Sequence, residues 1–110
     1  MYTFKDKNNR IFTLTLERWE HIIERHPEMK EHLLNLGKVL RSPDIVCRSK
    51  SVYTTLLYYK KFKRLLLKKI DFSNVYIAVL VDISNNQIKT AYPTRKLAKG
   101  RKIWERMTTD

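Results

Sequence analysis

The spacing of hydrophobic residues after Thr15 predicts an amphipathic helix that ends at His26. At about 100° per residue, one side of this helix is apolar and consists of Leu16, Trp19, Ile22 and Ile23. Thr15 is a suitable N-cap residue, because its hydroxyl can accept a hydrogen bond from a backbone N–H of the first turn. Pro27 disfavours helical geometry at the residue before it, so the helix should stop at His26.

A second helix is expected from Pro27 to the Ser42-Pro43 pair. Proline suits the first turn of a helix, and apolar residues follow at the spacing of one helical face, at Met29, Leu33, Leu36 and Leu40. Before both helices, two short apolar stretches flank a polar turn at residues 6–9, which predicts a β-hairpin over residues 2–14.

From Asp44 onward the pattern changes from helical to extended. Five strands are expected, at residues 45–49, 52–62, 64–72, 75–83 and 87–92. The segment 75–81 is continuously apolar, as expected of a central strand that is covered on both faces. The turn Ser84-Asn85-Asn86 predicts that the last two strands form an antiparallel hairpin.

The C-terminal part is predicted to be helical. Pro93 should end the last strand, and Thr94 should cap a short basic helix that carries Leu97, Ile103 and Trp104. Helices followed by a meander of strands are typical of the α+β class. We therefore expect one domain over residues 1–110, with an N-terminal hairpin and two helices packed on a mainly antiparallel sheet, and a short C-terminal helix.

The cellular compartment is predicted from two simple observations. Cys47 is the single cysteine, which excludes an internal disulfide and favours a free, buried thiol in a reducing cytoplasm. The longest apolar run is too short to cross a bilayer, and we recognise no signal peptide. We expect a cytoplasmic protein with no membrane partner.

Positive charge is concentrated in the second half of the chain. The net charge is +12, and residues 1–47 hold 8 Lys and Arg against 7 Asp and Glu, whereas residues 48–110 hold 15 against 4. The first basic cluster is Lys60, Lys61, Lys63, Arg64, Lys68 and Lys69, and the second is Arg95, Lys96, Lys99, Arg101, Lys102 and Arg106. We expect both to form one surface beside the first helix, facing RNA or an acidic protein.

A second side of the first helix carries Arg18, His21 and Arg25, which places an imidazole between two guanidinium groups. Guanidinium groups bind phosphate oxygens, and an imidazole titrates near neutral pH and can transfer protons. The pattern predicts a site for a phosphodiester. The alternative is a solvated helix surface, which is the commoner role of an Arg-x-x-His pair.

The last expected strand offers polar partners for such a site. Thr90 and Tyr92 point to the same side, because side chains alternate along a strand, and Thr94, Arg95 and Lys96 follow. A hydroxyl and a phenol at these positions can hold a phosphate or stack on a base. Packing against a neighbouring strand is the alternative role for Tyr92.

Three further expectations concern aromatic residues and histidines. His26 should be a helix cap or a buried, hydrogen-bonded imidazole. At most one of Tyr58 and Tyr59 should be buried, because neighbours in a strand face opposite ways. His21, His26 and His32 lack the i, i+4 spacing of a helical zinc pair, so we expect no metal and no cofactor.

Several segments occur together in an order known from one group of nucleases. They begin with the helix that carries Trp19, His21-Ile22 and the run Arg25-His26-Pro27-Glu28. They continue with Ser42-Pro43-Asp44, residues 57–60, the apolar strand, and Thr90-Ala91-Tyr92-Pro93-Thr94 followed by a basic residue. This series, which covers most of the chain, resembles the phage-type members of the barnase–EndoU–colicin–RelE (BECR) nuclease group.

The resemblance implies helices packed on an antiparallel sheet and metal-independent cleavage of RNA, often in toxin or conflict systems. It implies that Arg18 and His21 act with Thr90 and Tyr92, because a tRNA-cleaving colicin of the group pairs a basic residue and a histidine with a hydroxyl and an aromatic side chain. The group suggests the endoribonuclease function, and fold alone does not establish it.

Two features leave alternatives open. Catalytic residues vary among branches of the group, so Arg25 and His26 are the alternative pair on the helix. The segment 60–73 is longer and richer in lysine than the usual connection, which would extend an RNA groove or a partner surface. The residues expected to bind RNA are Lys60, Lys61, Lys63, Arg64, Thr94, Arg95 and Lys96.

Three functions are expected from these patterns and from the resemblance. The first is a metal-independent endoribonuclease that cleaves RNA by 2′-hydroxyl attack, as the toxin of a prophage or toxin–antitoxin locus with an acidic antitoxin or immunity protein as partner. The second is a non-catalytic RNA-binding or nucleic-acid-binding module, which the charge alone would support. The third is a basic adaptor protein that binds an acidic partner.

Overall fold

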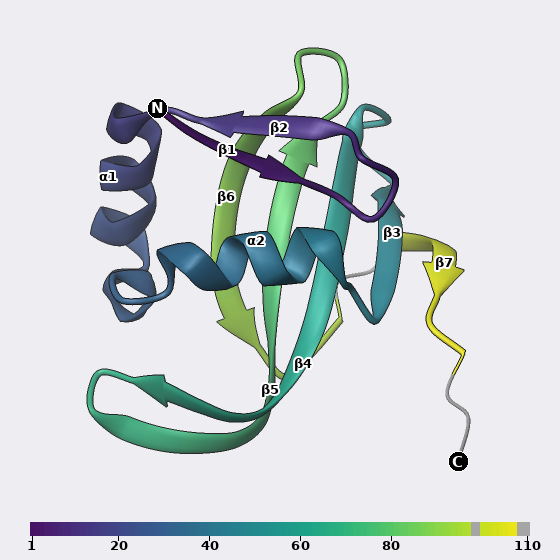
Figure 1. Ribbon diagram of the computed structural model, residues 1–110. Coiled ribbons are helices and arrows are strands. Elements are labelled where there is room, and N and C mark those ends of the chain that lie inside the picture. Colours follow the sequence, from purple (N-terminus) through teal and green to yellow (C-terminus); the bar gives the residue numbers. More distant parts are fainter. Residues whose placement is uncertain (98–99, 108–110) are drawn as a thin grey trace.

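The computed structural model describes residues 1–97 and 100–107, which place two α-helices and a short 3₁₀ helix against one sheet (Figure 1). The helical segments are α1 (Leu16–Arg25), η1 (Pro27–Met29) and α2 (Leu33–Arg41). The strands are β1 (Tyr2–Lys5), β2 (Ile11–Leu14), β3 (Ile45–Ser49), β4 (Thr55–Leu67), β5 (Ile70–Asp82), β6 (Gln87–Thr94) and β7 (Gly100–Glu105). The α+β class is confirmed. Among the described residues, no helix has the length and apolar character that crossing a membrane requires.

The strands form one sheet in the order β1-β2-β6-β5-β4-β3-β7. Neighbouring strands are antiparallel, with the exception of β2 and β6, which lie parallel and meet at Thr13 and Gln87. The expected pairings of β1 with β2 and of β5 with β6 are present. The prediction of a mainly antiparallel sheet is therefore confirmed.

Helix α1 begins and ends where the sequence predicts. The Thr15 hydroxyl accepts a hydrogen bond from the backbone N–H of Arg18 at 3.1 Å, and His26 is the C-cap residue. Trp19 and Ile22 are buried, and α1 stands beside β6 (Figure 1). Because Trp19 and Ile22 are buried, the side of α1 that carries His21 is left exposed, and Leu16, which was expected on the apolar side, is exposed as well.

The second helix begins later than predicted. Residues 27–29 form η1, and α2 begins at Leu33. The N-cap residue His32 has φ −115° and ψ 21°, and its buried imidazole bonds the Leu66 carbonyl at 2.6 Å and the Asn35 side-chain amide at 2.9 Å. These hydrogen bonds fix His32 in a non-helical conformation and separate the two helical segments.

The expected strands 52–62, 64–72 and 75–83 are in fact two long strands, β4 and β5. They are joined by a tight turn at Lys68 and Lys69, which have φ of 49° and 66°. The usual sequence signal of such a turn is Asn-Gly, so the pair of lysines gave no indication of a turn at this position. Asn74 has φ 54°, and near it the side of the hairpin that packs against the main core changes. The paired residues Phe62 and Val75 contact the core on one side of this point, and the pair Leu65 and Phe72 contacts it on the other.

The predicted C-terminal helix is wrong. Strand β6 continues through Pro93 to Thr94. Strand β2 pairs with β6 only near Gln87, so on that side of Pro93 there is no neighbouring strand that needs its missing N–H. Residues 100–105 form β7, which pairs antiparallel with β3 and sets Trp104 opposite Val46. Thr94 accepts from the N–H of Lys96 in a turn, and part of the expected helix, residues 98–99, lies outside the described residues.

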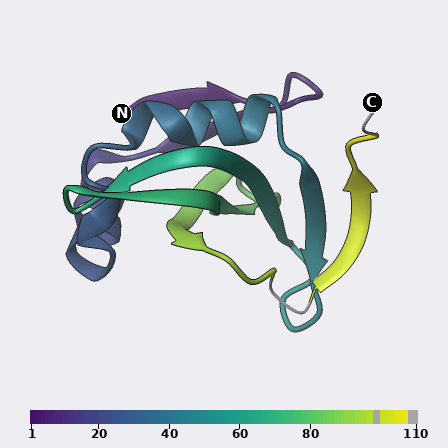
Figure 2. The same cartoon turned by 90° about the horizontal axis from the view of Figure 1, so that it is seen from below.

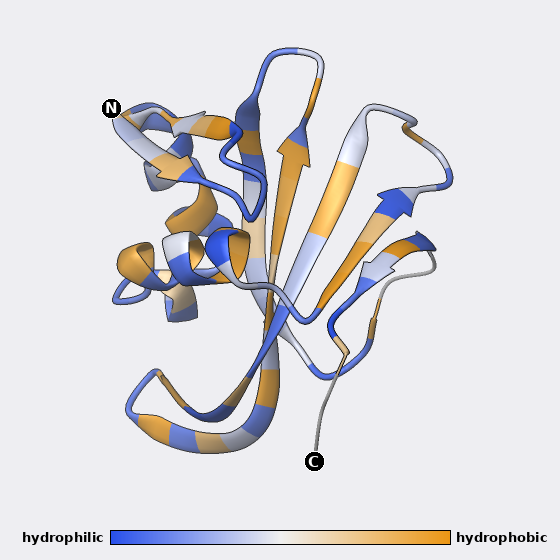
Figure 3. Cartoon of the chain, turned by 45° about the vertical axis from the view of Figure 1, so that its right-hand side comes forward, coloured by the Kyte–Doolittle hydropathy of each residue, from blue (hydrophilic) through white to orange (hydrophobic). Residues whose placement is uncertain are grey.

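The two faces of the sheet are built differently. The main core lies between the helices and one face, and Figure 3 shows hydrophobic residues alternating with polar ones along the strands. On the opposite face, here called the open face, no helix of the described residues lies over the middle of the sheet, and α1 stands at its β6 edge (Figure 2). A smaller cluster lies there, formed by Ile45, Cys47, Leu57, Tyr59 and Ala78. Burial raises the pKa of the Cys47 thiol.

Because each face has its own cluster, Tyr58 and Tyr59 are both buried, and the expectation that at most one would be is wrong. The Tyr58 hydroxyl donates to the Asp6 carboxylate at 2.8 Å. That carboxylate is also buried and accepts from two backbone N–H groups of its own turn. This hydrogen bond ties the β1–β2 turn to the centre of the sheet.

We expect Tyr58→Phe to lower the free energy of unfolding by about 1–3 kcal/mol, because it removes a hydrogen bond to a buried carboxylate. Urea unfolding should show a lower midpoint at an unchanged slope. Tyr53→Phe is the matched control, since Tyr53 is 76% exposed and should have no measurable effect. Equal midpoints for both variants would contradict this role of Tyr58.

Candidate active site

A groove of about 600 Å³ runs between α1 and β6. Its lining residues are Arg18, His21, Arg25, His26, Asp82, Asn85, Gln87, Ile88, Lys89, Thr90 and Tyr92. All six side chains that the sequence suggested as catalytic are in this set. The helix and the strand that carry them are far apart in the chain, and the burial of Trp19 and Ile22 brings them together.

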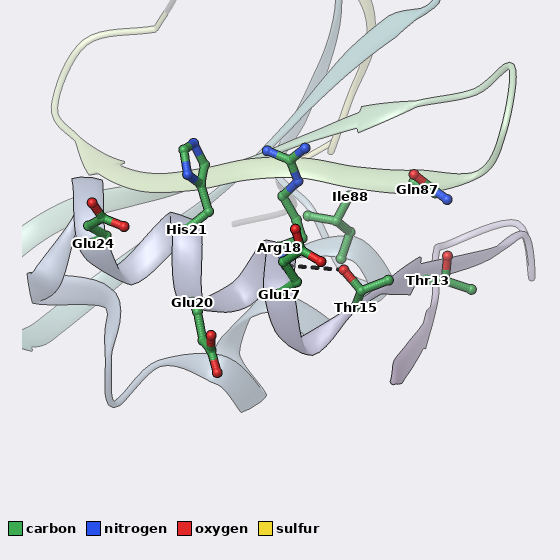
Figure 4. Close-up of a pocket in the computed structure, with 9 residues that line it drawn as sticks. All are labelled: Thr13, Thr15, Glu17, Arg18, Glu20, His21, Glu24, Gln87 and Ile88. Atoms are coloured by element: carbon green, nitrogen blue, oxygen red, sulfur yellow. Dashed lines mark hydrogen bonds between the residues drawn. The ribbon is translucent and has the colours of Figure 1, made fainter.

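Arg18 and His21 also border a second hollow of about 620 Å³ at the start of α1. Figure 4 shows both side chains directed toward β6, whereas Glu20 points away from it. Within residues 1–97 and 100–107, neither Arg18 nor Arg25 takes part in an ion pair. Both guanidinium groups are exposed, so they are available to an anionic ligand.

The two histidines of the groove have different surroundings. His21 is exposed on the middle turn of α1. His26 is half-buried, and its ring lies against the ring of Tyr92 with centroids 5.5 Å apart and planes 33° apart. The expected capping role of His26 is present, since its backbone N–H donates to the Ile22 carbonyl. The alternative of a buried, hydrogen-bonded imidazole is not what the described residues show.

Tyr92 is the half-buried aromatic residue of the groove. Burial raises the pKa of its phenol above the ordinary value, while a hydrogen bond with Tyr59 acts in the opposite direction. The phenol is therefore protonated at neutral pH and can donate a hydrogen bond. Thr90 and Tyr92 stand opposite Leu80 and Ala78 of β5, so they face the same side as predicted.

Sequence reasoning missed the far end of the groove. The pairing of β5 with β6 shifts between Leu80 and Val81, so Lys89 is an extra residue of a bulge that places it in the lining. Its ammonium donates to the Thr55 hydroxyl at 2.8 Å. Asp82 also lines the groove, and hydrogen bonds from Ser84 lower the pKa of its carboxyl. A bulge has no reliable sequence signal, so Lys89 could not be found in this way. The spacing of Asp82 and Ser84 is a recognisable turn signal and could have pointed to Asp82.

The expected RNA-binding residues of the first basic cluster divide between two environments. Lys61 and Lys63 are exposed. Lys60 is half-buried and donates to the Ser42 carbonyl, and Arg64 forms an exposed ion pair with Asp71. Lys61 and Lys63 are therefore the members of this set whose ammonium groups form no ion pair with the described residues and are accessible to a ligand.

The second basic cluster is divided between two parts of the sheet. Arg95 donates to the Ser73 carbonyl at 3.0 Å beside β6, and Lys96 is exposed next to it. Arg101, Lys102 and Arg106 lie on or just after β7, and β5, β4 and β3 separate them from β6. The expectation that this whole cluster lies beside α1 is wrong for the β7 residues, and Lys99 lies outside the described residues.

Comparison of the chain with protein-family models, with curated proteins and with solved structures finds no match. In the described part of the chain, no group of three or more His, Cys, Asp or Glu side chains is placed to hold a metal ion.

Proposed function

We propose that this chain is a metal-independent endoribonuclease, with the groove between α1 and β6 as its active site. The observation that carries the proposal is that Arg18, His21 and Arg25 share one groove with Thr90 and Tyr92. The two guanidinium groups, which form no ion pair with the described residues, suit a phosphodiester, and an imidazole between them suits proton transfer at that phosphate. The resemblance to BECR nucleases supports the same activity.

The proposed reaction uses the RNA itself as the nucleophile. The imidazole of His21 takes the proton from a 2′-hydroxyl, the 2′-oxygen attacks the adjacent phosphorus, and the bond from phosphorus to the 5′-oxygen breaks. The guanidinium groups of Arg18 and Arg25 stabilise the negative charge that develops on the phosphate oxygens. The products are a 2′,3′-cyclic phosphate and a 5′-hydroxyl.

The leaving 5′-oxygen needs a proton from a second group. His26 and Tyr92 are in contact with each other and line the same groove, so either can supply it. The alternative assignment exchanges the two histidines, with His26 as the base. Toxin function, with an acidic antitoxin or immunity protein as partner, belongs to this proposal because the cleavage of cellular RNA would be harmful to the host.

We expect the purified protein to cleave RNA in the presence of EDTA. The ends should be a 2′,3′-cyclic phosphate or 3′-phosphate and a 5′-hydroxyl, and DNA of the same sequence should be bound but not cut. End-group analysis of a labelled RNA makes this measurement. If no RNA is cut under any condition while binding persists, the protein is a nucleic-acid-binding module, for which the net charge of +12 is the supporting observation.

A further inference from the structure

A continuous series of aromatic contacts leads from the groove across the open face. His26 lies against Tyr92, and Tyr92 shares a hydrogen bond with Tyr59. The Tyr59 ring in turn meets the Tyr76 ring edge-on, with centroids 6.2 Å apart. The Lys61 ammonium lies 5.9 Å from the centre of the Tyr76 ring. These contacts link five side chains, one from the N-cap of η1 and four from the neighbouring strands β6, β5 and β4.

The strand registers explain why these side chains share a face. Tyr92 of β6 is opposite Ala78 of β5, which is opposite Tyr59 of β4. Two residues along β5, Tyr76 stands between Lys61 and Thr94 and so faces the same way. The small side chain of Ala78 separates the larger rings and lets Tyr59 and Tyr92 approach each other.

The ends of the series differ in exposure and in charge. Tyr59 and Ala78 are fully buried, and Tyr76 and Tyr92 are half-buried with part of their surface accessible. Lys61 is exposed at one end, and the cationic part of the groove lies at the other. Partly accessible rings with nearby cations are the features that proteins use to bind bases and phosphates of an unpaired strand.

A base-paired duplex does not fit this arrangement, because its bases are stacked on one another and cannot lie on Tyr76. From these contacts we infer that the open face binds a single-stranded segment of the RNA substrate. The base next to the cleaved linkage stacks on Tyr76, and its phosphate contacts Lys61. This inference rests on the proposed function for the nature of the substrate, and it adds that the substrate is unpaired at the site.

Binding can be tested separately from cleavage. The probe is a fluorescent strand of about 12 nucleotides with 2′-fluoro sugars, which has no 2′-hydroxyl to attack, compared with the same strand annealed to its complement. Fluorescence anisotropy at matched salt concentrations gives both affinities. We expect the single strand to bind at least about tenfold more tightly than the duplex.

The variants identify the surface. Tyr76→Ala should weaken binding of the single strand by about tenfold, whereas Tyr76→Phe, which keeps the ring, should stay within about twofold. Lys61→Ala should reduce the slope of log affinity against log salt by about 0.7, as expected for one lost phosphate contact. Lys38→Ala is the matched control, because Lys38 is an exposed lysine on α2.

Four outcomes are informative. Equal or tighter binding of the duplex overturns the inference, as does parental affinity in both Tyr76→Ala and Lys61→Ala. Since Lys61 is exposed, its variant reports on the surface even where Tyr76→Ala disturbs folding. If the expected binding pattern is found but unmodified RNA is never cut, the binding face stands and the endoribonuclease proposal fails. If RNA is cut but Tyr76→Ala and Lys61→Ala bind the single strand with parental affinity, the endoribonuclease proposal stands and the binding face fails.

Discussion

His21→Ala is expected to lower the rate of RNA cleavage by about a hundredfold or more, because it removes the group that transfers the proton in the transition state. Affinity for RNA should be nearly unchanged, since the guanidinium groups of Arg18 and Arg25 supply the main contacts to phosphate. Single-turnover cleavage and equilibrium binding of the same labelled RNA measure the two effects separately. His21 is exposed, so the substitution should not alter stability.

The controls come from the same helix and the same groove. Glu20→Ala changes an exposed side chain of α1 that points away from β6 (Figure 4) and should cleave at the parental rate. His26→Ala tests the alternative assignment. A folded but inactive His26 variant beside a fully active His21 variant would show that His26 is the base. Parental rates in both would remove catalysis by histidine from the proposal.

The second large effect is the salt dependence of RNA binding. If the two guanidinium groups of the groove together with Lys61, Lys63 and Arg95 neutralise about five phosphates, affinity should fall about a hundredfold between 50 and 200 mM salt. Titrations of a single-stranded probe over that range give the slope. Arg18→Ala should lower both affinity and slope, since its guanidinium has no ion pair with the described carboxylates. An affinity that does not change with salt would instead favour an acidic protein as the partner.

The parts of the fold that the sequence predicted are those with local signals. Thr15 and Pro27 mark the ends of α1 by hydrogen bonding and sterics within a few residues. The extent of α2 was missed because His32 is held by the carbonyl of Leu66, which is distant in sequence. Strand β7 was missed because its basic sequence resembles a helix surface, and only pairing with β3 makes it a strand.

The candidate site divides in the same way. The stripe of Arg18, His21 and Arg25 could be read from helical spacing, and Thr90 with Tyr92 from strand alternation. That helix and strand form one groove was a hypothesis from the chemistry of their side chains, and the resemblance supported it. Lys89 could not be predicted, because a bulge in the pairing with β5 places it there. Long-range pairing, rather than local preference, decides these positions.

The pairing of Pro93 also determines which backbone groups of β6 point away from β5. Along an antiparallel pair, residues that bond the partner strand alternate with residues that face away from it. Pro93 has no N–H and so takes a position facing away from β5, opposite Ile77, which gives Ala91 the same orientation two residues earlier. That edge of β6 therefore presents a backbone donor and acceptor at Ala91 but only an acceptor at Pro93. This difference lies in the main chain of β6, so no side-chain truncation would remove it.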